Sequence, residues 1–228
     1  MNESELLFSL LTKLNALTGG LFLLCAFGLV AIRQMLTCLR IYVGQALLLA
    51  ISAVILGYYH ASIHLYVVAA LTIITKVFII PWVLRHSIGY DSFSKREISQ
   101  ALNIPTTLLL SAAITIFAYY ISSPLLKAAA ADVFEKVNLP IGMASLLIGA
   151  YTVTVRGEAV PQLLGILAME NGAFFAGVSI ASNLPLIAEL AAAFYVLITV
   201  LVIGLLAMRI HEKIAKTAVG EMMALREE

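Results

Sequence analysis

The chain alternates between long apolar runs and short polar connectors, and the runs have the length of membrane-spanning helices. A helix needs about 20 apolar residues to cross about 30 Å of hydrocarbon. Seven runs meet or approach that length: 14–32, 41–58, 63–84, 104–122, 139–155, 160–182 and 185–208. The connectors leave no room for a soluble domain. The pattern therefore predicts one all-α integral membrane domain with about seven transmembrane helices, the fifth being the shortest.

Composition agrees with this pattern. Hydrophobic residues make up 62% of the 228 residues, charged residues make up 12%, and the mean hydropathy is +1.02. The length alone would suggest one or two soluble domains, but this composition indicates a membrane protein instead. Cys25 and Cys38 fall in or near predicted spans, which favours packing roles over a disulfide or a metal site.

Basic residues are concentrated in alternate connectors, and this sets the expected orientation. The first, third and fifth connectors and the tail 209–228 hold most of the Lys and Arg residues: Arg33, Arg40, Arg85, Lys95, Arg96, Arg156, Arg209, Lys213, Lys216 and Arg226. The other side holds Lys13, Lys127 and Lys136. Because basic loops stay in the cytoplasm, we expect the N-terminus outside and the C-terminus inside, in the cytoplasmic (inner) membrane.

Two opposite charges lie inside predicted spans at nearly the same depth. By helical rise, Glu170 is about 15 Å from the cytoplasmic end of its span and Lys76 about 12 Å. A charge at the bilayer centre costs on the order of 2.5–3.5 kcal/mol. We therefore predict a Lys76–Glu170 pair, direct or through water. The alternatives are a Lys76 that snorkels to the headgroups and a Glu170 that forms a static structural pair or is a protonated carboxyl bonded to backbone.

Small residues surround Glu170 at helical spacing. Ala168, Gly172 and Ala176 form one small-xxx-small face, and Ala173 and Gly177 form a second. Such faces let neighbouring backbones approach closely. We expect other helices to cover this helix on both sides.

Further polar residues could extend a path for protons or ions. Asn171 could hydrogen-bond to a neighbouring helix, and Gln45 and Asn15 could join the path. Glu189 lies about 6 Å from the outer surface by helical rise and is either an interfacial anchor or part of the path. Pro81 should kink or end the third span.

The sequence shows no active site of its own. It has no phosphate-binding loop, dinucleotide fingerprint, CxxC pair or nucleophile with a base. His60 and His64 have a spacing that could bind a metal on a helix, but two ligands alone make a poor site. We therefore expect no catalytic residue, no metal and no nucleic-acid partner.

Two motifs resemble a known family. The stretch LAMENG at 167–172, followed by aromatic and small residues, resembles the signature of hydrogenase-4 component E. That family comprises membrane subunits of group 4 nickel–iron hydrogenases, including formate hydrogenlyase-type complexes. The stretch ITKV at 74–77, with Pro81 beyond it, is similar to the third helix of the same family, from which Lys76 carries over.

A weak internal repeat divides the predicted spans into two triplets. They are a first three-helix unit (1–84) and a second three-helix unit (139–208), joined by a linking helix (104–122) and followed by a cytoplasmic tail. The second unit is similar to the K subunit of respiratory complex I and to the C subunit of multisubunit Na⁺/H⁺ antiporters. By that similarity Glu170 corresponds to the central glutamate of the second helix, and Glu189 to the acid of the third.

The function implied is that of a non-catalytic subunit of a complex I-like, energy-converting hydrogenase. Nickel–iron and iron–sulfur centres would lie on cytoplasmic partner subunits, with no cofactor on this chain. Its membrane partners would be antiporter-like and complex I H-subunit-like chains, with lipid around them. Two alternatives remain open: a subunit of a cation/proton antiporter, and a stand-alone small-solute transporter built from repeated helix triplets.

Overall fold

The computed structural model describes residues 3–88, 98, 102–128 and 132–180. Every regular element in these ranges is helical: α1 (Glu3–Ala31), α2 (Met35–Tyr59), α3 (Ile63–Thr72), the π-helix η1 (Ile73–Ile79), α4 (Ile80–Ile88), α6 (Ile104–Ala128), α7 (Val133–Val155) and α8 (Ala159–Ile180). The seventh predicted run, 185–208, and the tail lie outside the described residues.

Within the described ranges, five helical segments are long and apolar enough to cross a membrane. They are Glu5–Ala31, Met35–Tyr59, Ile63–Arg85, Ile104–Lys127 and Val133–Val155. The third of these joins α3, η1 and α4 into one continuous rod. The predicted all-α architecture is therefore confirmed for the described residues, and these five segments are consistent with the predicted membrane protein.

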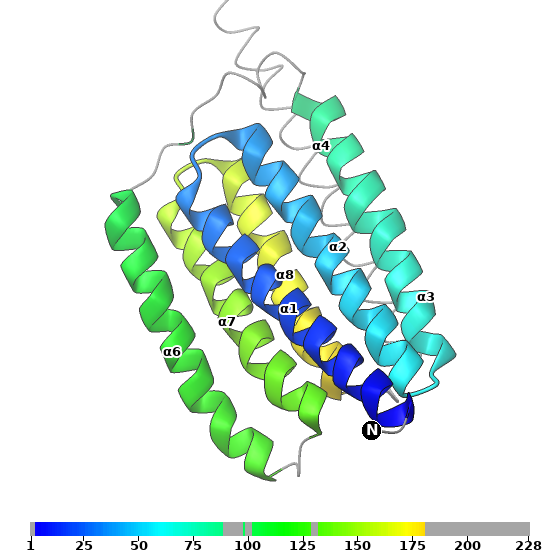
Figure 1. The fold of residues 1–228 in the computed structure, drawn as a ribbon. Helices are drawn as coiled ribbons and strands as arrows, with labels where there is room; N and C mark the ends of the chain where they lie inside the picture. Colours follow the sequence, from blue (N-terminus) through cyan, green and yellow to red (C-terminus); the bar gives the residue numbers. More distant parts are fainter. Residues whose placement is uncertain (1–2, 89–97, 99–101, 129–131, 181–228) are drawn as a thin grey trace, which may run out of the picture.

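The helices form an elongated bundle (Figure 1). α1 packs against both α2 and α7, and α7 makes its most extensive contact with α8. The α3–η1–α4 rod packs on α2 at one edge, and α6 packs on α7 at the other. α8 also contacts α2, so residues from α2, α7 and α8 meet inside the bundle.

The fifth span begins earlier in the structure than the sequence predicted. Instead of starting at 139, α7 begins at Val133 and has 23 residues. Asp132 caps it, because its carboxylate accepts from the Val133 amide at 2.6 Å while Glu135 Oε2 accepts from the Asp132 amide at 3.1 Å. This reciprocal capping box starts the helix within a polar stretch that hydropathy assigns to a connector.

Pro81 was expected to kink or end the third span, and it does not end it. The helix continues through it as α4, and the irregularity lies just before it, in η1. At the end of η1 the Ile80 amide donates to the Thr75 carbonyl, five residues back. The wider π-helical turn provides an alternative hydrogen-bond pattern where a proline removes a donor from the α-helical ladder.

The predicted close approach of backbones is confirmed on one face of α8. A Cβ added to Gly172 would lie 2.8 Å from the Gly142 carbonyl oxygen and would also meet the Leu146 amide nitrogen. On the second predicted face, Ala173 is exposed to the described helices and no described residue lies within 4 Å of a Cβ built on Gly177. The run 185–208, which follows α8 and is the neighbour expected there, lies outside the described residues, so this part stays a prediction.

Arg156 has a role that its place in a basic connector did not suggest. Only 2% of the residue is exposed. Its Nη2 donates to the carbonyls of Leu29, Val30 and Ile32 at 2.9, 3.1 and 2.7 Å. The final carbonyls of a helix have no partner within the helix, so this guanidinium completes the end of α1 from the connector between α7 and α8.

Candidate functional site

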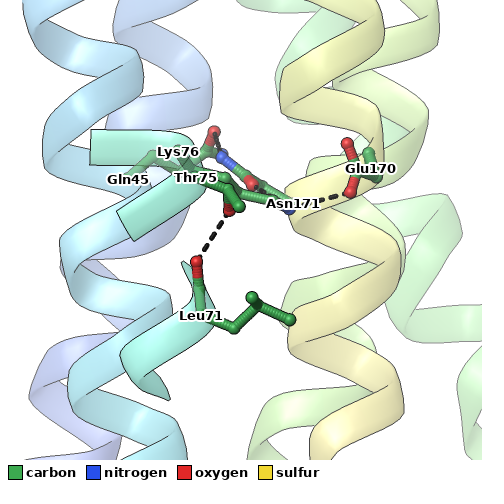
Figure 2. A network of polar contacts seen from close by, with 6 residues as sticks. All are labelled: Gln45, Leu71, Thr75, Lys76, Glu170 and Asn171. Atoms are coloured by element: carbon green, nitrogen blue, oxygen red, sulfur yellow. Dashed lines mark hydrogen bonds and ion pairs between the residues drawn. The ribbon is translucent and has the colours of Figure 1, made fainter. Parts of the chain in front are cut away.

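Lys76 and Glu170 form an ion pair inside the bundle. The Lys76 Nζ lies 2.9 Å from Glu170 Oε1, and the two side chains are 5% and 18% exposed. Lys76 comes from η1 and Glu170 from α8, elements separated by much of the sequence (Figure 2). The predicted pair is confirmed as a direct contact. Because the ammonium faces the bundle and is buried, the snorkelling alternative is wrong.

The ammonium has further partners that fix its position. Its Nζ donates to Asn171 Oδ1 at 2.8 Å and lies 4.6 Å from the centre of the Phe174 ring. Asn171 Nδ2 in turn donates to Gln45 Oε1 at 3.4 Å. Asn171 and Gln45 are fully buried, and the hydrogen bond that Asn171 was expected to make to a neighbouring helix is confirmed. A carboxylate, an amide oxygen and an aromatic face thus surround one cation.

The π-helix is the local feature that carries Lys76. Thr75, next to it, donates its hydroxyl to the Leu71 carbonyl at 2.8 Å (Figure 2). Leu71 lies near the end of α3, so this bond joins the π-helical segment to the α-helical turn just before it. π-helical turns often occur at functional sites, and here one presents the buried lysine to α8.

A small cavity adjoins the pair. It measures about 20 Å³ and is lined by residues of the α3–η1 rod and α8: Val68, Leu71, Thr72, Thr75, Lys76, Glu170 and Phe174. This volume is about that of one water molecule, and the lining supplies polar partners for it. Glu170 is the more exposed member of the pair.

Several buried polar atoms near this region have no protein partner among the described residues. They are the Tyr42 hydroxyl, Gln45 Nε2 and the Ser145 hydroxyl, all in fully buried residues. An unpaired buried polar group costs about 1–3 kcal/mol, and bound water is the usual remedy. These atoms mark positions on α2 and α7 where water would extend the polar site.

A second polar cluster lies between α1, α2 and α7. Asn15 Nδ2 donates to Asn138 Oδ1 at 2.8 Å, and the Ser52 hydroxyl donates to Asn15 Oδ1 at 2.9 Å. Asn15 was a candidate from the sequence, whereas Asn138 and Ser52 were not. Seven residues separate Gln45 from Ser52, about 10 Å by helical rise, so both occupy one face of α2.

We expect Asn138→Leu to destabilise the protein by about 1 kcal/mol, because Asn15 Nδ2 loses its partner while Ser52 still serves the oxygen. Denaturation in mixed micelles would measure the loss. Asn15→Leu combined with Asn138→Leu should cost less than the sum of the two single variants, since no amide is left unpaired. Additive losses would show that the two side chains do not interact.

Three further residues considered from the sequence, Glu189, Cys25 and Cys38, are not part of either polar cluster among the described residues. Glu189 lies outside the described residues. Within the described ranges Cys25 and Cys38 are free, and no group of three or more potential ligands from His, Cys, Asp and Glu gathers around one point. The Cys38 thiol donates to the Ile32 carbonyl at 3.2 Å, which fits a packing role.

Comparison with known proteins identifies one relative at the level of sequence. The chain is 28% identical over 220 residues to the "Uncharacterized protein Rv0085" of Mycobacterium tuberculosis (strain ATCC 25618 / H37Rv), covering 96% of this chain and 98% of that protein. No family model matches the chain. No solved structure matches it either.

Proposed function

We propose that this protein is a non-catalytic membrane subunit of a complex I-like, energy-converting hydrogenase, with Lys76 and Glu170 on a path for protons or sodium ions. The observation that carries the proposal is the buried ion pair, 2.9 Å between Nζ and Oε1, within a polar network of α2, η1 and α8. The family comes from the resemblance of LAMENG and ITKV to hydrogenase-4 component E.

Stability alone is a poor reason for this arrangement. Buried pairs often contribute little, because removing two charges from water offsets their attraction. This pair also adjoins a cavity of about one water and unpaired polar atoms on α2 and α7. A static pair needs neither of these features, whereas a proton relay needs both water and exchangeable partners.

The pair can change charge in two balanced steps. A proton that arrives at the Glu170 carboxylate converts it to a neutral carboxyl and leaves the ammonium held by Asn171 Oδ1 and the Phe174 ring. The ammonium can then release a proton to water or to a neighbouring group, which gives a neutral amine. A charge change in an adjacent subunit would bias these steps through the low-dielectric interior.

The proposed topology has seven spans. α8 and the run 185–208 would complete the five candidate spans, with the N-terminus outside and the C-terminus in the cytoplasm. The described arginines Arg33, Arg40, Arg85 and Arg156 occupy connectors or helix ends on the side that the charge rule assigns to the cytoplasm. Redox subunits with nickel–iron and iron–sulfur centres would dock on that side.

The space beside the pair favours an ion over an organic solute. A cavity of about 20 Å³ holds one water, whereas sites for small molecules usually measure about 300–1,000 Å³. This observation weighs against the stand-alone solute transporter. An antiporter subunit would use the same pair, and its partners would distinguish it from a hydrogenase subunit.

The partners are the first test. The tagged chain would be purified from its native membrane in mild detergent, and co-purifying proteins would be identified by mass spectrometry. Hydrogenase and antiporter-like subunits are the expected companions. Antiporter-like subunits without a hydrogenase would support the antiporter, and a chain that purifies alone would contradict both complexes.

Glu170→Gln should reduce ion translocation by roughly tenfold or more while the complex still assembles, because the amide keeps the shape of the carboxyl but cannot carry a proton. Ion uptake by reconstituted vesicles, normalised to assembled complex, would measure it. Glu5→Gln, at the exposed start of α1, is the matched control and should have no effect. Unchanged translocation in assembled Glu170→Gln would contradict the proposed path.

A further inference from the structure

A groove on the outside of the bundle is separate from the charged pair. It lies between α2 and the η1–α4 segment and encloses about 550 Å³. Its lining residues are Leu39, Arg40, Val43, Val77, Phe78, Pro81, Trp82 and Arg85. The volume falls in the range of small-molecule sites, and nothing in the ion path uses it.

The groove is ordered from a basic end to an apolar end. Arg40 lies near the beginning of α2 and Arg85 near the end of the α3–η1–α4 rod, which Figure 1 shows at the same end of the bundle. Phe78 is seven residues before Arg85, about 10 Å by helical rise. Val43 lies three residues after Arg40 and Val77 eight residues before Arg85, each toward the middle of its helix, whereas Leu39 lies beside Arg40 at the basic end. Two cations thus lie at one end of the groove, and the other end is lined by apolar side chains.

The chemistry of the basic end selects a phosphate. Arginine presents a planar fork that binds phosphate oxygens in pairs. Both arginines are exposed, and none of the described residues that line the groove is acidic. Trp82, two-thirds exposed, lies between the arginines and the apolar part, where tryptophan usually marks the membrane–water interface.

We propose that this groove binds an anionic phospholipid, with its phosphate between Arg40 and Arg85 and an acyl chain along Val43, Val77 and Phe78. Two arginines favour an anionic headgroup over a neutral one. The order of basic and apolar residues along the groove matches the order of headgroup and acyl chain in a membrane leaflet. A free phosphate would use the arginines but leave the apolar groove empty. The site is independent of the proposed ion path.

A second groove provides a matched control. It lies between α6 and α7, encloses about 660 Å³ and contains two cations, Lys127 and Lys136. Lysine binds phosphate as a hydrated point charge rather than as a fork. Neutralising Lys127 and Lys136 changes the net charge by the same amount as neutralising Arg40 and Arg85. It leaves the proposed phosphate site intact.

Native mass spectrometry of the purified full chain, with whatever subunits accompany it, would compare added phosphatidylglycerol with phosphatidylcholine. We expect the wild type to retain phosphatidylglycerol preferentially. Arg40→Gln with Arg85→Gln should weaken its retention roughly thirtyfold and leave phosphatidylcholine unchanged. Lys127→Gln with Lys136→Gln should retain the wild-type preference. Equal losses in the two double variants, or no loss in the arginine variant, would overturn the proposal.

Photocrosslinking of the wild-type protein tests the same site without relying on a variant that must fold. Phosphatidylglycerol with a photoreactive acyl chain should crosslink to residues 77–82, and excess unlabelled phosphatidylglycerol, but not inorganic phosphate, should compete. Val43→Trp should block crosslinking from the apolar end while both arginines remain. Crosslinks spread over the whole surface, or competition by inorganic phosphate, would contradict a phospholipid site.

Discussion

Gly172→Ala is expected to destabilise the protein by about 2–3 kcal/mol, although alanine is the better helix former. The new methyl group would meet the Leu146 amide nitrogen and would lie 2.8 Å from the Gly142 carbonyl oxygen. Both are backbone atoms of α7, and they cannot move aside as a flexible side chain can. α8 must therefore shift away from α7 and lose contacts along its length.

Gly20→Ala is the control for this prediction. Gly20 lies in α1, is exposed, and has no described residue within 4 Å of an added Cβ. Alanine there should be neutral or should stabilise by about 0.4–1 kcal/mol, because it restricts the unfolded chain. Unfolding in mixed micelles would measure both variants. If the two substitutions had equal effects, the close approach of α7 and α8 would not be limiting.

Lys76→Met is expected to destabilise the protein by about 3 kcal/mol, because it leaves Glu170 without its cationic partner. The full penalty of a buried lone charge does not apply, since 18% of the Glu170 side chain is exposed. Asn171 Oδ1 also loses its donor. Unfolding in mixed micelles at a fixed pH would measure the loss.

The double variant Lys76→Met with Glu170→Leu should recover most of that loss. Replacing both members of a buried pair by apolar residues is often neutral or stabilising. This non-additivity would show that the two charges depend on one another in the folded protein. Lys13→Met, which removes an exposed lysine from α1, should change stability by less than about 0.5 kcal/mol. A double variant as unstable as the sum of the single variants would contradict the pair.

The ion pair was predictable because depth along a helix is readable from sequence. Counting residues from the cytoplasmic ends placed Lys76 and Glu170 at similar levels, and the cost of a charge in hydrocarbon supplied the reason to pair them. Asn171 and Gln45 were predictable as polar residues, but their order around the ammonium was not. That order depends on the rotation of three helices about their axes, which apolar composition leaves open.

Other features were missed because their signal is not local. Arg156 reads as one more basic connector residue, yet its guanidinium serves the end of a helix more than 120 residues away. Asn138 was assigned to a connector because hydropathy does not detect a capping box at Asp132. At Pro81 the sequence predicted a kink or an end of the helix and not the π-helix before it, since a proline shows where a helical hydrogen bond is lost but not how the helix adapts.

The bond from Arg156 to the end of α1 has a consequence for the timing of synthesis. The carbonyls of Leu29, Val30 and Ile32 are separated from Arg156 by 127, 126 and 124 residues. At about 5–20 residues per second, the ribosome needs roughly 6–25 s to make that stretch. During this interval Arg156 is absent, and water, the translocation machinery or, at Ile32, the Cys38 thiol must take its place as donor. The hydrogen bonds at the end of α1 are therefore complete only after α7 and Arg156 have been synthesised.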